Sequence, residues 1–463
     1  MNDLMSPTVI PRPANDDLAQ ALELVSDASE PAAASAVDVL NSYAVVFMAA
    51  FLVTLLSTPL VRWLALACKI TDRPDRIRKA HAYPVPYLGG VAVYLGLMAG
   101  VAISYLYFDR TASHFRQIPM AVVVGMAAIM FTGLADDVWG LGPRLKIAGQ
   151  LVAAAALAIE NVGVRVAAGL VEPFADLLDP LLGTEHLVYT ALPTPWGDLV
   201  YWMGTALIAI FVLGGCNAAN LLDGLDGLLS GVVGIVVVGL LAISVLMVLH
   251  LPPESPLGEE PLAGARIALC LALLGAVLGF LPHNFNPASI FLGDCGSLLL
   301  GYLCVVIILM FGEYGHTHLV FAGLIIFSVP IMDTTLAIIR RWLAGSPLSV
   351  ADDQHIHHQL KRALGGTKRA VFAVYGVSLA FAIVGVTLAA LVMWAQIRIR
   401  IIYAIALVLF GFITMIAVKT VRRQRHIAMA QEKGTVSAPP VVEPPPGAPA
   451  AGTTPPRSES LRR

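Results

Sequence analysis

The chain has 463 residues, of which 57% are hydrophobic and 13% are charged, and its mean hydropathy is +0.78. Because soluble domains carry about 25% charged residues, this composition excludes an ordinary soluble protein and predicts a polytopic membrane protein. The formal net charge is -2, without the clustered positive charge of nucleic-acid binders. We therefore expect a membrane partner and no nucleic acid.

The amino-terminal tail, residues 1–42, is the first predicted unit. Its first forty residues contain seven acidic side chains and a single basic one, Arg12. They lack the basic start and the apolar centre of a secretory signal. We expect this segment to be retained as a disordered, extracytoplasmic tail.

Apolar stretches fill residues 43–420, which we predict to be the transmembrane domain. A helix needs about 20 apolar residues to cross a bilayer core, and on this measure the chain is an all-α polytopic membrane protein with about eleven transmembrane helices. The fourth span is the weakest because Glu160 and Arg165 cut it short. The spans are predicted near 43–68, 88–107, 118–135, 145–161, 199–217, 228–250, 264–282, 297–312, 318–339, 370–394 and 399–418.

Lys and Arg residues gather in alternate turns of this predicted bundle. They cluster after the first, third, ninth and eleventh spans, whereas the other turns carry only scattered bases. Because cytoplasmic loops hold the excess of Lys and Arg, we expect these turns to face the cytoplasm from the cell membrane. Residues 421–463 follow on the same side, and their Pro-rich composition predicts a disordered cytoplasmic tail.

Five cysteines lie in or beside apolar segments, and none of them belongs to a CxxC pair. We interpret them as core thiols rather than as disulfides or metal ligands. They are Cys68, Cys216, Cys270, Cys295 and Cys304.

Asp136 and Asp137 end the third predicted span. Two adjacent carboxylates at a membrane boundary repel each other unless a cation or a proton lies between them, so the pair indicates a divalent metal or a proton acceptor. A solvated helix end is the structural alternative. Lys146 opens the next span and is close enough in sequence to attract a phosphate.

Polar residues then recur at helical spacing from Asn217 through Asn220 and Asp223 to Asp226. If this stretch stays helical, the side chains line one stripe, and oxygen ligands without sulfur suit a hard ion such as Mg²⁺. The pattern lacks the alternating ligands and terminal Glu of a calcium loop. A polar helix cap is the structural alternative.

Phe291 lies three residues before Asp294 in a turn that contains glycine. An aromatic face can stack on a nucleobase while the acid holds a metal that bridges phosphates. This string is a weak signal alone. It gains weight because its turn and those of the other motifs follow alternate spans and should share one side of the membrane.

His355, His357 and His358 follow the ninth span. A zinc site is disfavoured because closed zinc sites recruit four ligands and no cysteine lies nearby. Hydrogen bonds to phosphate or sugar oxygens fit better, and surface histidines on a loop helix are the structural alternative. Asp333, inside the ninth span, is interpreted as a structural partner of Arg340 or Arg341 in preference to a proton-relay acid.

Taken together and in this order, the strings resemble the polyprenyl-phosphate N-acetylhexosamine-1-phosphate transferase superfamily, which includes phospho-N-acetylmuramoyl-pentapeptide transferase. Ile356 interrupts the three successive histidines of the muramoyl-pentapeptide branch. The chain therefore looks like the branch that transfers N-acetylglucosamine 1-phosphate to undecaprenyl phosphate. The resemblance covers residues 43 to 420 and rests on Arg78 to Gly90, Asp136 to Gln150, Asn217 to Gly227, Phe291 to Ser297 and His355 to His358.

The resemblance also implies roles for single residues. Asn220 and Asp294 match positions that bind Mg²⁺, or Mn²⁺ in its place, on the diphosphate of a nucleotide sugar. Phe291 matches an aromatic that stacks on uracil, and Asp136 matches an acid proposed to take a proton from the lipid phosphate. The candidate catalytic residues are Asp136, Asp137, Asp223 and Asp294; the candidate substrate-binding residues are Lys79, Lys146, Asn217, Asp226, Phe291, His355, His357 and His358; the candidate metal ligands are Asn220 and Asp294.

The expected activity is transfer of a sugar 1-phosphate from a UDP-sugar to undecaprenyl or another polyprenyl phosphate, releasing UMP and starting a lipid-linked envelope glycan. The active site is expected to face the cytoplasm, and a homodimer is left open. One alternative is the muramoyl-pentapeptide transferase reaction. The other is a secondary transporter, which the motifs disfavour because transporter sites lie near the bilayer midplane and these acids lie at the ends of spans.

Overall fold

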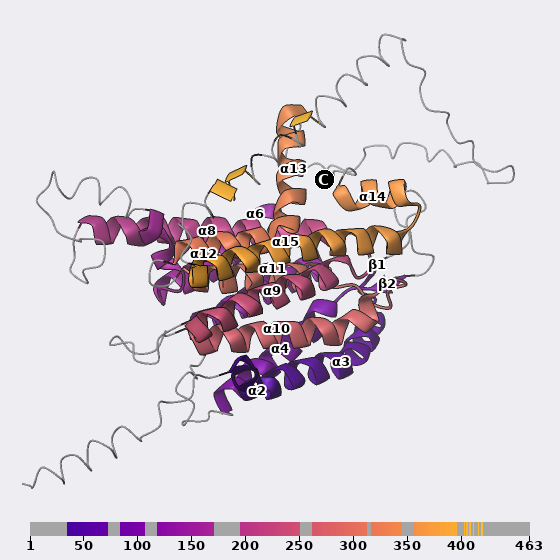
Figure 1. The fold of residues 1–463 in the computed structure, drawn as a ribbon. Coiled ribbons are helices and arrows are strands. Elements are labelled where there is room, and N and C mark those ends of the chain that lie inside the picture. Colours follow the sequence, from indigo (N-terminus) through magenta and orange to yellow (C-terminus); the bar gives the residue numbers. More distant parts are fainter. Residues whose placement is uncertain are drawn as a thin grey trace, which may run out of the picture.

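The computed structural model describes residues 35–72, 84–106, 118–170, 195–250, 262–312, 316–344 and 355–395, with scattered positions between 402 and 419. Within these residues the chain is helical apart from one pair of two-residue strands (Figure 1). Among them, eight helices are long and apolar enough to cross a membrane, or up to ten spans if each of two bent pairs counts as one. The all-α polytopic class is confirmed, and the count of eleven is not; most of the span predicted at 399–418 lies outside the described residues.

The elements follow one another with short connections where the chain is described. The shortest helices, α2 and α14, lie outside the spans that could cross a membrane. The elements are α2 (Ala36–Ser42), α3 (Ala44–Ala67), β1 (Thr71–Asp72), β2 (Val85–Pro86), α4 (Gly89–Leu106), α5 (Met120–Trp139), α6 (Pro143–Ile159), the 3-10 helix η1 (Val164–Ala167), α8 (Pro195–Leu222), α9 (Leu228–His250), α10 (Ala263–Asn284), α11 (Gly293–Met310), α12 (Thr317–Ile326), α13 (Ser328–Ala344), α14 (Ile356–Leu364) and α15 (Thr367–Ala395).

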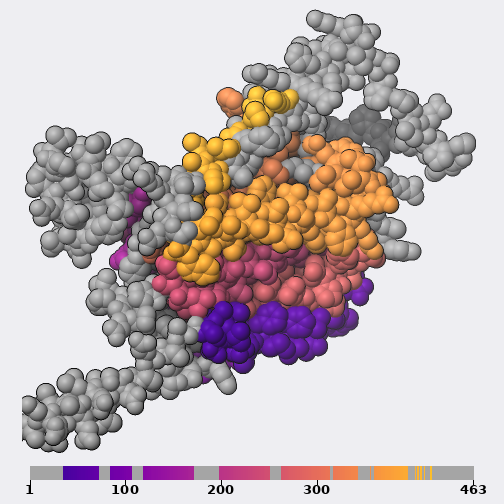
Figure 2. All heavy atoms as spheres, in the orientation of Figure 1, coloured from indigo at the N-terminus to yellow at the C-terminus, as the bar shows by residue number. Residues whose placement is uncertain are grey.

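Helix α11 is the centre of the bundle. Inside the protein, 89% of its span is buried, compared with 28% for α3 and 22% for α15. Figure 2 shows α3 along one edge of the visible face and the orange carboxyl-terminal helices across it. Apolar side chains on α3 remain exposed, with Leu56 at 71% and Trp63 at 65%. A helix that is apolar all round suits a membrane, so these exposed side chains are expected to face lipid.

Glycines allow close helix contacts at the beginning of α11. A Cβ at Gly90 of α4 would lie 2.1 Å from the backbone nitrogen of Gly296. A Cβ at Gly133 of α5 would lie 2.4 Å from the Cα of Cys295. Because a methyl group at either position would overlap backbone atoms, the small residues let α4 and α5 approach the end of α11 that carries Asp294.

Two predicted spans are bent. Helix α6 and residues Val164–Leu170 meet at 83°, at the place where Glu160 was expected to weaken the span. The span predicted at 318–339 is not straight: α12 and Ser328–Trp342 of α13 meet at 77°, and α13 stands across the direction of the other helices (Figure 1). Pro330 has no N–H to bond to the carbonyl of Ile326, four residues earlier, which accounts for a break at this point.

Helical structure is present before the predicted boundary at residue 43. Ser35 and Asp38 form a capping box, because the amide of Asp38 donates to Ser35 Oγ at 3.2 Å and the amide of Ser35 donates to Asp38 Oδ2 at 3.3 Å. Val39 and Tyr43 are buried. The end of the tail is therefore helical and packed, whereas residues 1–34 lie outside the described part of the chain.

A small hairpin connects the first span to the loop before α11. Thr71 pairs with Pro86, and Asp72 pairs with Val85. The carbonyl of Pro86 then accepts from the amide of Phe291 at 2.9 Å. All five cysteines are free thiols, and all but Cys68 are buried.

Candidate active site

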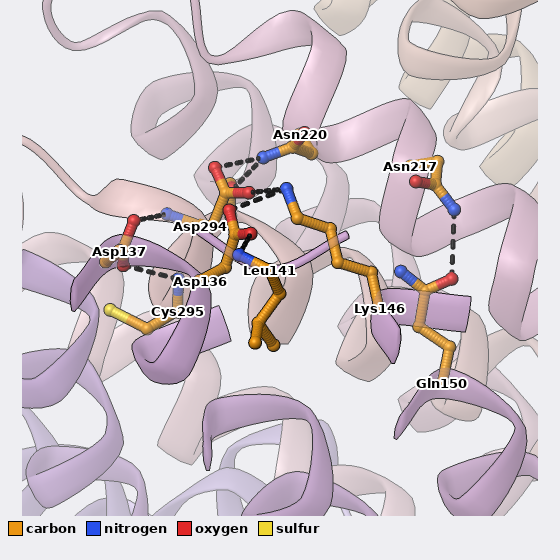
Figure 3. A network of polar contacts seen from close by, with 10 residues as sticks. Asp136, Asp137, Leu141, Lys146, Gln150, Asn217, Asn220, Asp294 and Cys295 are labelled. Carbon is orange, nitrogen blue, oxygen red and sulfur yellow. Dashed lines mark hydrogen bonds and ion pairs between the residues drawn. The ribbon is translucent and has the colours of Figure 1, made fainter. Parts of the chain in front are cut away.

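Four helix ends bring the predicted acids together. Asp136 and Asp137 lie in the last turn of α5, and Lys146 lies in the first turn of α6 (Figure 3). Asn220 is in the last turn of α8, and Asp294 is at the beginning of α11. Residues that are far apart in sequence therefore converge at one end of the bundle, as the alternate-span argument predicted.

Lys146 is the central cation of this cluster. Its Nζ lies 2.6 Å from Asp136 Oδ2 and 2.6 Å from Asp294 Oδ2, with 27% of its side chain exposed. The other oxygen of Asp136 accepts from the amide of Leu141 at 2.7 Å. The ammonium offsets the repulsion that two neighbouring carboxylates would otherwise suffer. The site thus places one carboxylate on each side of a single positive charge.

Asp137 makes different contacts from those of Asp136. Its Oδ1 accepts from the amide of Asp294 at 2.8 Å, and its Oδ2 accepts from the amide of Cys295 at 3.0 Å. Amides in the first turn of a helix have no partner within the helix, and a carboxylate there also interacts favourably with the helix dipole. Asp137 therefore caps α11 from α5 and positions Asp294. Its predicted catalytic role stays a prediction.

Asn220 adjoins Asp294, as expected for the proposed metal ligands. Its Nδ2 donates to Asp294 Oδ1 at 2.9 Å and to Ser297 Oγ at 2.9 Å. Among the described residues, no group of three or more His, Cys, Asp or Glu side chains has an arrangement that could hold a metal. The chemistry of the donors nevertheless fits a hard cation, because they are carboxylate and amide oxygens without sulfur. The Lys146 ammonium also shows that a positive charge is accommodated between Asp136 and Asp294.

Asp223 lies in the turn that follows α8, where its amide donates to the carbonyl of Asn220 at 3.3 Å. Burial and the nearby carboxylates of Asp294 and Asp137 together raise the pKa of the Asp223 carboxyl to about 8. The turn is therefore a region of negative potential in which an additional anion is unfavourable and a cation is favourable.

The predicted single stripe from Asn217 to Asp226 does not form, because α8 ends at Leu222. Asn217 donates from Nδ2 to Gln150 Oε1 at 3.0 Å, at a distance from the acid cluster (Figure 3). Gly227, at φ +75°, continues the turn. The helical spacing thus holds for Asn217 and Asn220 only.

Asp226 anchors the loop before α11 instead of joining the acids. Its Oδ2 accepts from Asn286 Nδ2 at 2.8 Å and from the amide of Ala288 at 3.1 Å. Phe291 follows in the same loop, and its ring lies 6.1 Å from the ring of Tyr87 at a tilt of 49°. Tyr87 is an aromatic neighbour that the sequence analysis missed, because only the fold brings the segment after β2 to this loop.

The histidine motif is only partly described. His355 is buried, and its Nδ1 lies 3.0 Å from Asp333 Oδ2. This partner was not predicted, since the sequence favoured an arginine for Asp333. His357 and His358 lie in α14 with side chains outside the described set, and Lys79 lies in the segment 73–83 that is not described.

The fold and the site together define a multi-pass membrane protein with an ionisable cluster at one end of its helix bundle. Comparison with known proteins identifies the family within this class. The model of glycosyl transferase family 4 matches residues 119–312. The probable undecaprenyl-phosphate N-acetylglucosaminyl 1-phosphate transferase of Bacillus subtilis (strain 168) is 32% identical over 375 residues, which cover 80% of this chain and 91% of that protein.

Other relatives extend the comparison. The decaprenyl-phosphate N-acetylglucosaminephosphotransferase of Mycolicibacterium smegmatis is 33% identical over 357 residues, covering 73% of this chain and 79% of the relative. The phospho-N-acetylmuramoyl-pentapeptide-transferase of Bacillus mycoides is 30% identical over 268 residues, which cover 56% of this chain and 70% of that protein. The chain belongs to glycosyl transferase family 4, the polyprenyl-phosphate N-acetylhexosamine-1-phosphate transferase superfamily that its motifs resemble.

Proposed function

We propose that the protein transfers N-acetylglucosamine 1-phosphate from UDP-N-acetylglucosamine to undecaprenyl or another polyprenyl phosphate and releases UMP. The observation that carries this proposal is the cluster in which Lys146 lies between Asp136 and Asp294, with Asn220 beside them. Relatives with matching printed names cover most of this chain, which supports the same assignment.

In the proposed reaction, an oxygen of the lipid phosphate attacks the β-phosphorus of the donor. The bond from that phosphorus to the oxygen bridging to UMP breaks, and UMP leaves with the electron pair. Reactions of this kind ask the protein mainly for positioning and charge neutralisation. Because the second pKa of a phosphate monoester is about 6, the acceptor is mostly dianionic at neutral pH. Asp136 needs to accept only a residual proton.

The charged residues would divide the remaining tasks. Lys146 would contact a phosphate oxygen, and Asp137 would keep Asp294 in place by holding the first amides of α11. Asn220 and Asp294 would hold Mg²⁺, or Mn²⁺ in its place. A bound divalent cation supplies charge neutralisation on the diphosphate and on the departing UMP.

We place the site on the cytoplasmic side of the cell membrane. Lys146 lies in the site itself, and Arg144 lies in the same first turn of α6. Lys69 follows α3, just before the hairpin that contacts the loop preceding α11. The positive-inside rule assigns such an end to the cytoplasm. Cysteine labelling from each side of sealed vesicles, at positions introduced next to Asp136 and Asp294, tests this orientation.

The activity is tested with purified protein in lipid nanodiscs, supplied with Mg²⁺, undecaprenyl phosphate and UDP-N-acetylglucosamine. The proposal expects UMP release that requires the lipid, and Asp294→Asn is expected to lose it. A rival donor, UDP-N-acetylmuramoyl-pentapeptide, is included because the muramoyl-pentapeptide branch also matches this chain. Preference for that donor, or solute uptake without UMP release, would replace the proposal by one of its alternatives.

A further inference from the structure

One buried contact between a carboxylate and an imidazole has no part in the cluster described above. Asp333 Oδ2 lies 3.0 Å from His355 Nδ1, and the two residues are 0% and 6% exposed. Asp333 belongs to α13, just after the 77° bend that separates α13 from α12. His355 is the residue that precedes α14. The pair therefore joins the bent ninth span to the beginning of the helix that carries the histidine motif.

The energetic case for this contact is strong. A carboxylate taken out of water is unfavourable unless a partner compensates it, and removing one partner from a buried pair leaves the other without compensation. The hydrogen bond also makes Nδ1 the protonated ring nitrogen, so that both the tautomer and the ring orientation of His355 are fixed. His355 is thus held in one place by a residue 22 positions earlier in the chain.

Helix α14 depends on such an anchor. It has only nine residues, and helices of this length are marginal in water without tertiary contacts. Its first turn forms around His355, whose carbonyl accepts from the amide of Gln359 at 3.1 Å. Its other end is defined by Gly365, at φ +67°, before α15 begins. The position of His355 consequently sets where α14 starts and where the next two histidines lie along the helix.

We infer that Asp333 is the positioning residue of the histidine motif: by holding His355, it fixes the amino-terminal end of α14 and with it His357 and His358. This inference rests on the proposed function for the statement that the motif serves donor binding. It gives Asp333 a defined partner, His355, that the sequence did not predict. It also couples the bend in the ninth span to the geometry of the motif.

A double-mutant cycle tests the coupling. The variants Asp333→Ala, His355→Ala and the double variant are compared for kcat and KM toward UDP-N-acetylglucosamine. Partners that orient a functional histidine typically contribute about 10–100-fold, so we expect each single change to lower kcat/KM by an amount of this order. The kcat/KM of the double variant is expected to be no lower than that of the more impaired single variant, because both changes remove the same contact. Losses that multiply, or wild-type kinetics of Asp333→Ala, would overturn the inference.

Ser378→Ala is the matched control. Ser378 is a fully buried polar residue of α15 whose Oγ has no hydrogen-bond partner among the residues that the structure describes. We expect this variant to keep the wild-type kcat/KM. A loss equal to that of Asp333→Ala would mean that any buried polar change in this region impairs the enzyme, and the inference would fail.

Hydrogen exchange gives a readout that does not need turnover. In Asp333→Asn, which keeps the side-chain shape if Asp333→Ala does not fold, the amides of α14 are expected to exchange faster while those of α15 are unchanged. Unchanged exchange in α14, or an equal increase throughout the bundle, would contradict the positioning role. If the wild-type protein releases no UMP, the proposed function fails, whereas the exchange result still decides whether Asp333 anchors α14.

Discussion

Lys146 reaches Asp294 across 148 positions of sequence, with its Nζ 2.6 Å from Oδ2. The same ammonium lies 2.6 Å from Asp136 Oδ2. One positive charge thus links the end of α5, the beginning of α6 and the beginning of α11. The proposed role of this contact is to hold two carboxylates together at the membrane boundary, where a bound cation would in turn attract a phosphate.

Replacing Lys146 removes that charge. Lys146→Met keeps the length of the side chain but leaves Asp136 and Asp294 to repel each other, and the phosphate loses a contact. We expect kcat/KM to fall about 100-fold or more, the scale of losing one preorganised electrostatic contact. UMP release measures this directly. Lys368→Met, which removes an exposed lysine at the beginning of α15, should be silent, and an equal loss in both variants would refute the assignment.

Replacing Asp137 is predicted to lower the stability of the protein more than replacing Asp136 does. In Asp137→Asn, the side-chain NH₂ group replaces one of the two accepting oxygens. It cannot accept from a backbone N–H of α11, so part of the cap on α11 is lost. Caps are worth about 0.5–2 kcal/mol, and thermal unfolding in detergent should show a lower Tm. Asp136→Asn should lose activity with little change in Tm. The reverse order of the two melting temperatures would rule out the cap.

The crossing of α4 and α11 should tolerate no side chain at Gly90. In Gly90→Ala, the new Cβ would meet the Gly296 backbone nitrogen at 2.1 Å, so the helices must separate and the site must distort. We expect low yield of folded protein and a lower Tm. Gly214→Ala in α8 is the control, because nothing lies within 4 Å of its added Cβ and alanine favours a helix. Equal yields of the two variants would contradict the packing described here.

The pKa of Asp223 predicts a pH dependence with a definite sign. The pKa is about 8 in the folded protein and about 3.9 in an unfolded chain, so between these values the folded state binds one more proton. The unfolding free energy supplied by this group therefore falls as pH rises through that window. In EDTA, the Tm of the wild type should decline toward pH 8 relative to that of Asp223→Asn. Parallel Tm curves for the two proteins would show that Asp223 is not the group responsible.

Mg²⁺ should oppose this decline, because a cation favours the ionised carboxylates around it. The increase in Tm on adding Mg²⁺ is expected to be larger near pH 8 than near pH 6. It should be lost in Asp294→Asn, in which a proposed ligand is neutral. A Mg²⁺ effect of the same size in wild type and variant would place the ion elsewhere.

The sequence predicted those features that depend on local pattern. Apolar runs located most spans, and the placement of acids at the ends of alternate spans predicted that Asp136 and Asp294 meet. The pattern could not reveal that Asp137 caps α11, because this contact depends on how closely α5 crosses α11 at Gly133. Nor could apolarity distinguish a straight ninth span from one bent near Pro330, since the two helices together are apolar enough to cross a membrane in either form.

The polar contacts were the least predictable part of the site. Asn217 has the same spacing to Asn220 as a member of the cluster would have, yet its amide pairs with Gln150 from α6. Asp333 was assigned to an arginine on its own helix, and the structure adds a contact with His355 that the sequence did not predict. In both cases the partner comes from a different element, and only the packing of the bundle selects it.

The proposed transfer reaction is best tested by following the lipid product and UMP together in one assay. Purified wild-type protein with Mg²⁺, undecaprenyl phosphate and UDP-N-acetylglucosamine is predicted to form lipid-linked diphospho-N-acetylglucosamine and UMP in equal amounts, whereas EDTA or Asp294→Asn abolishes both. Formation of both products at the wild-type rate by Asp294→Asn, or their absence from the wild-type reaction, would contradict the account.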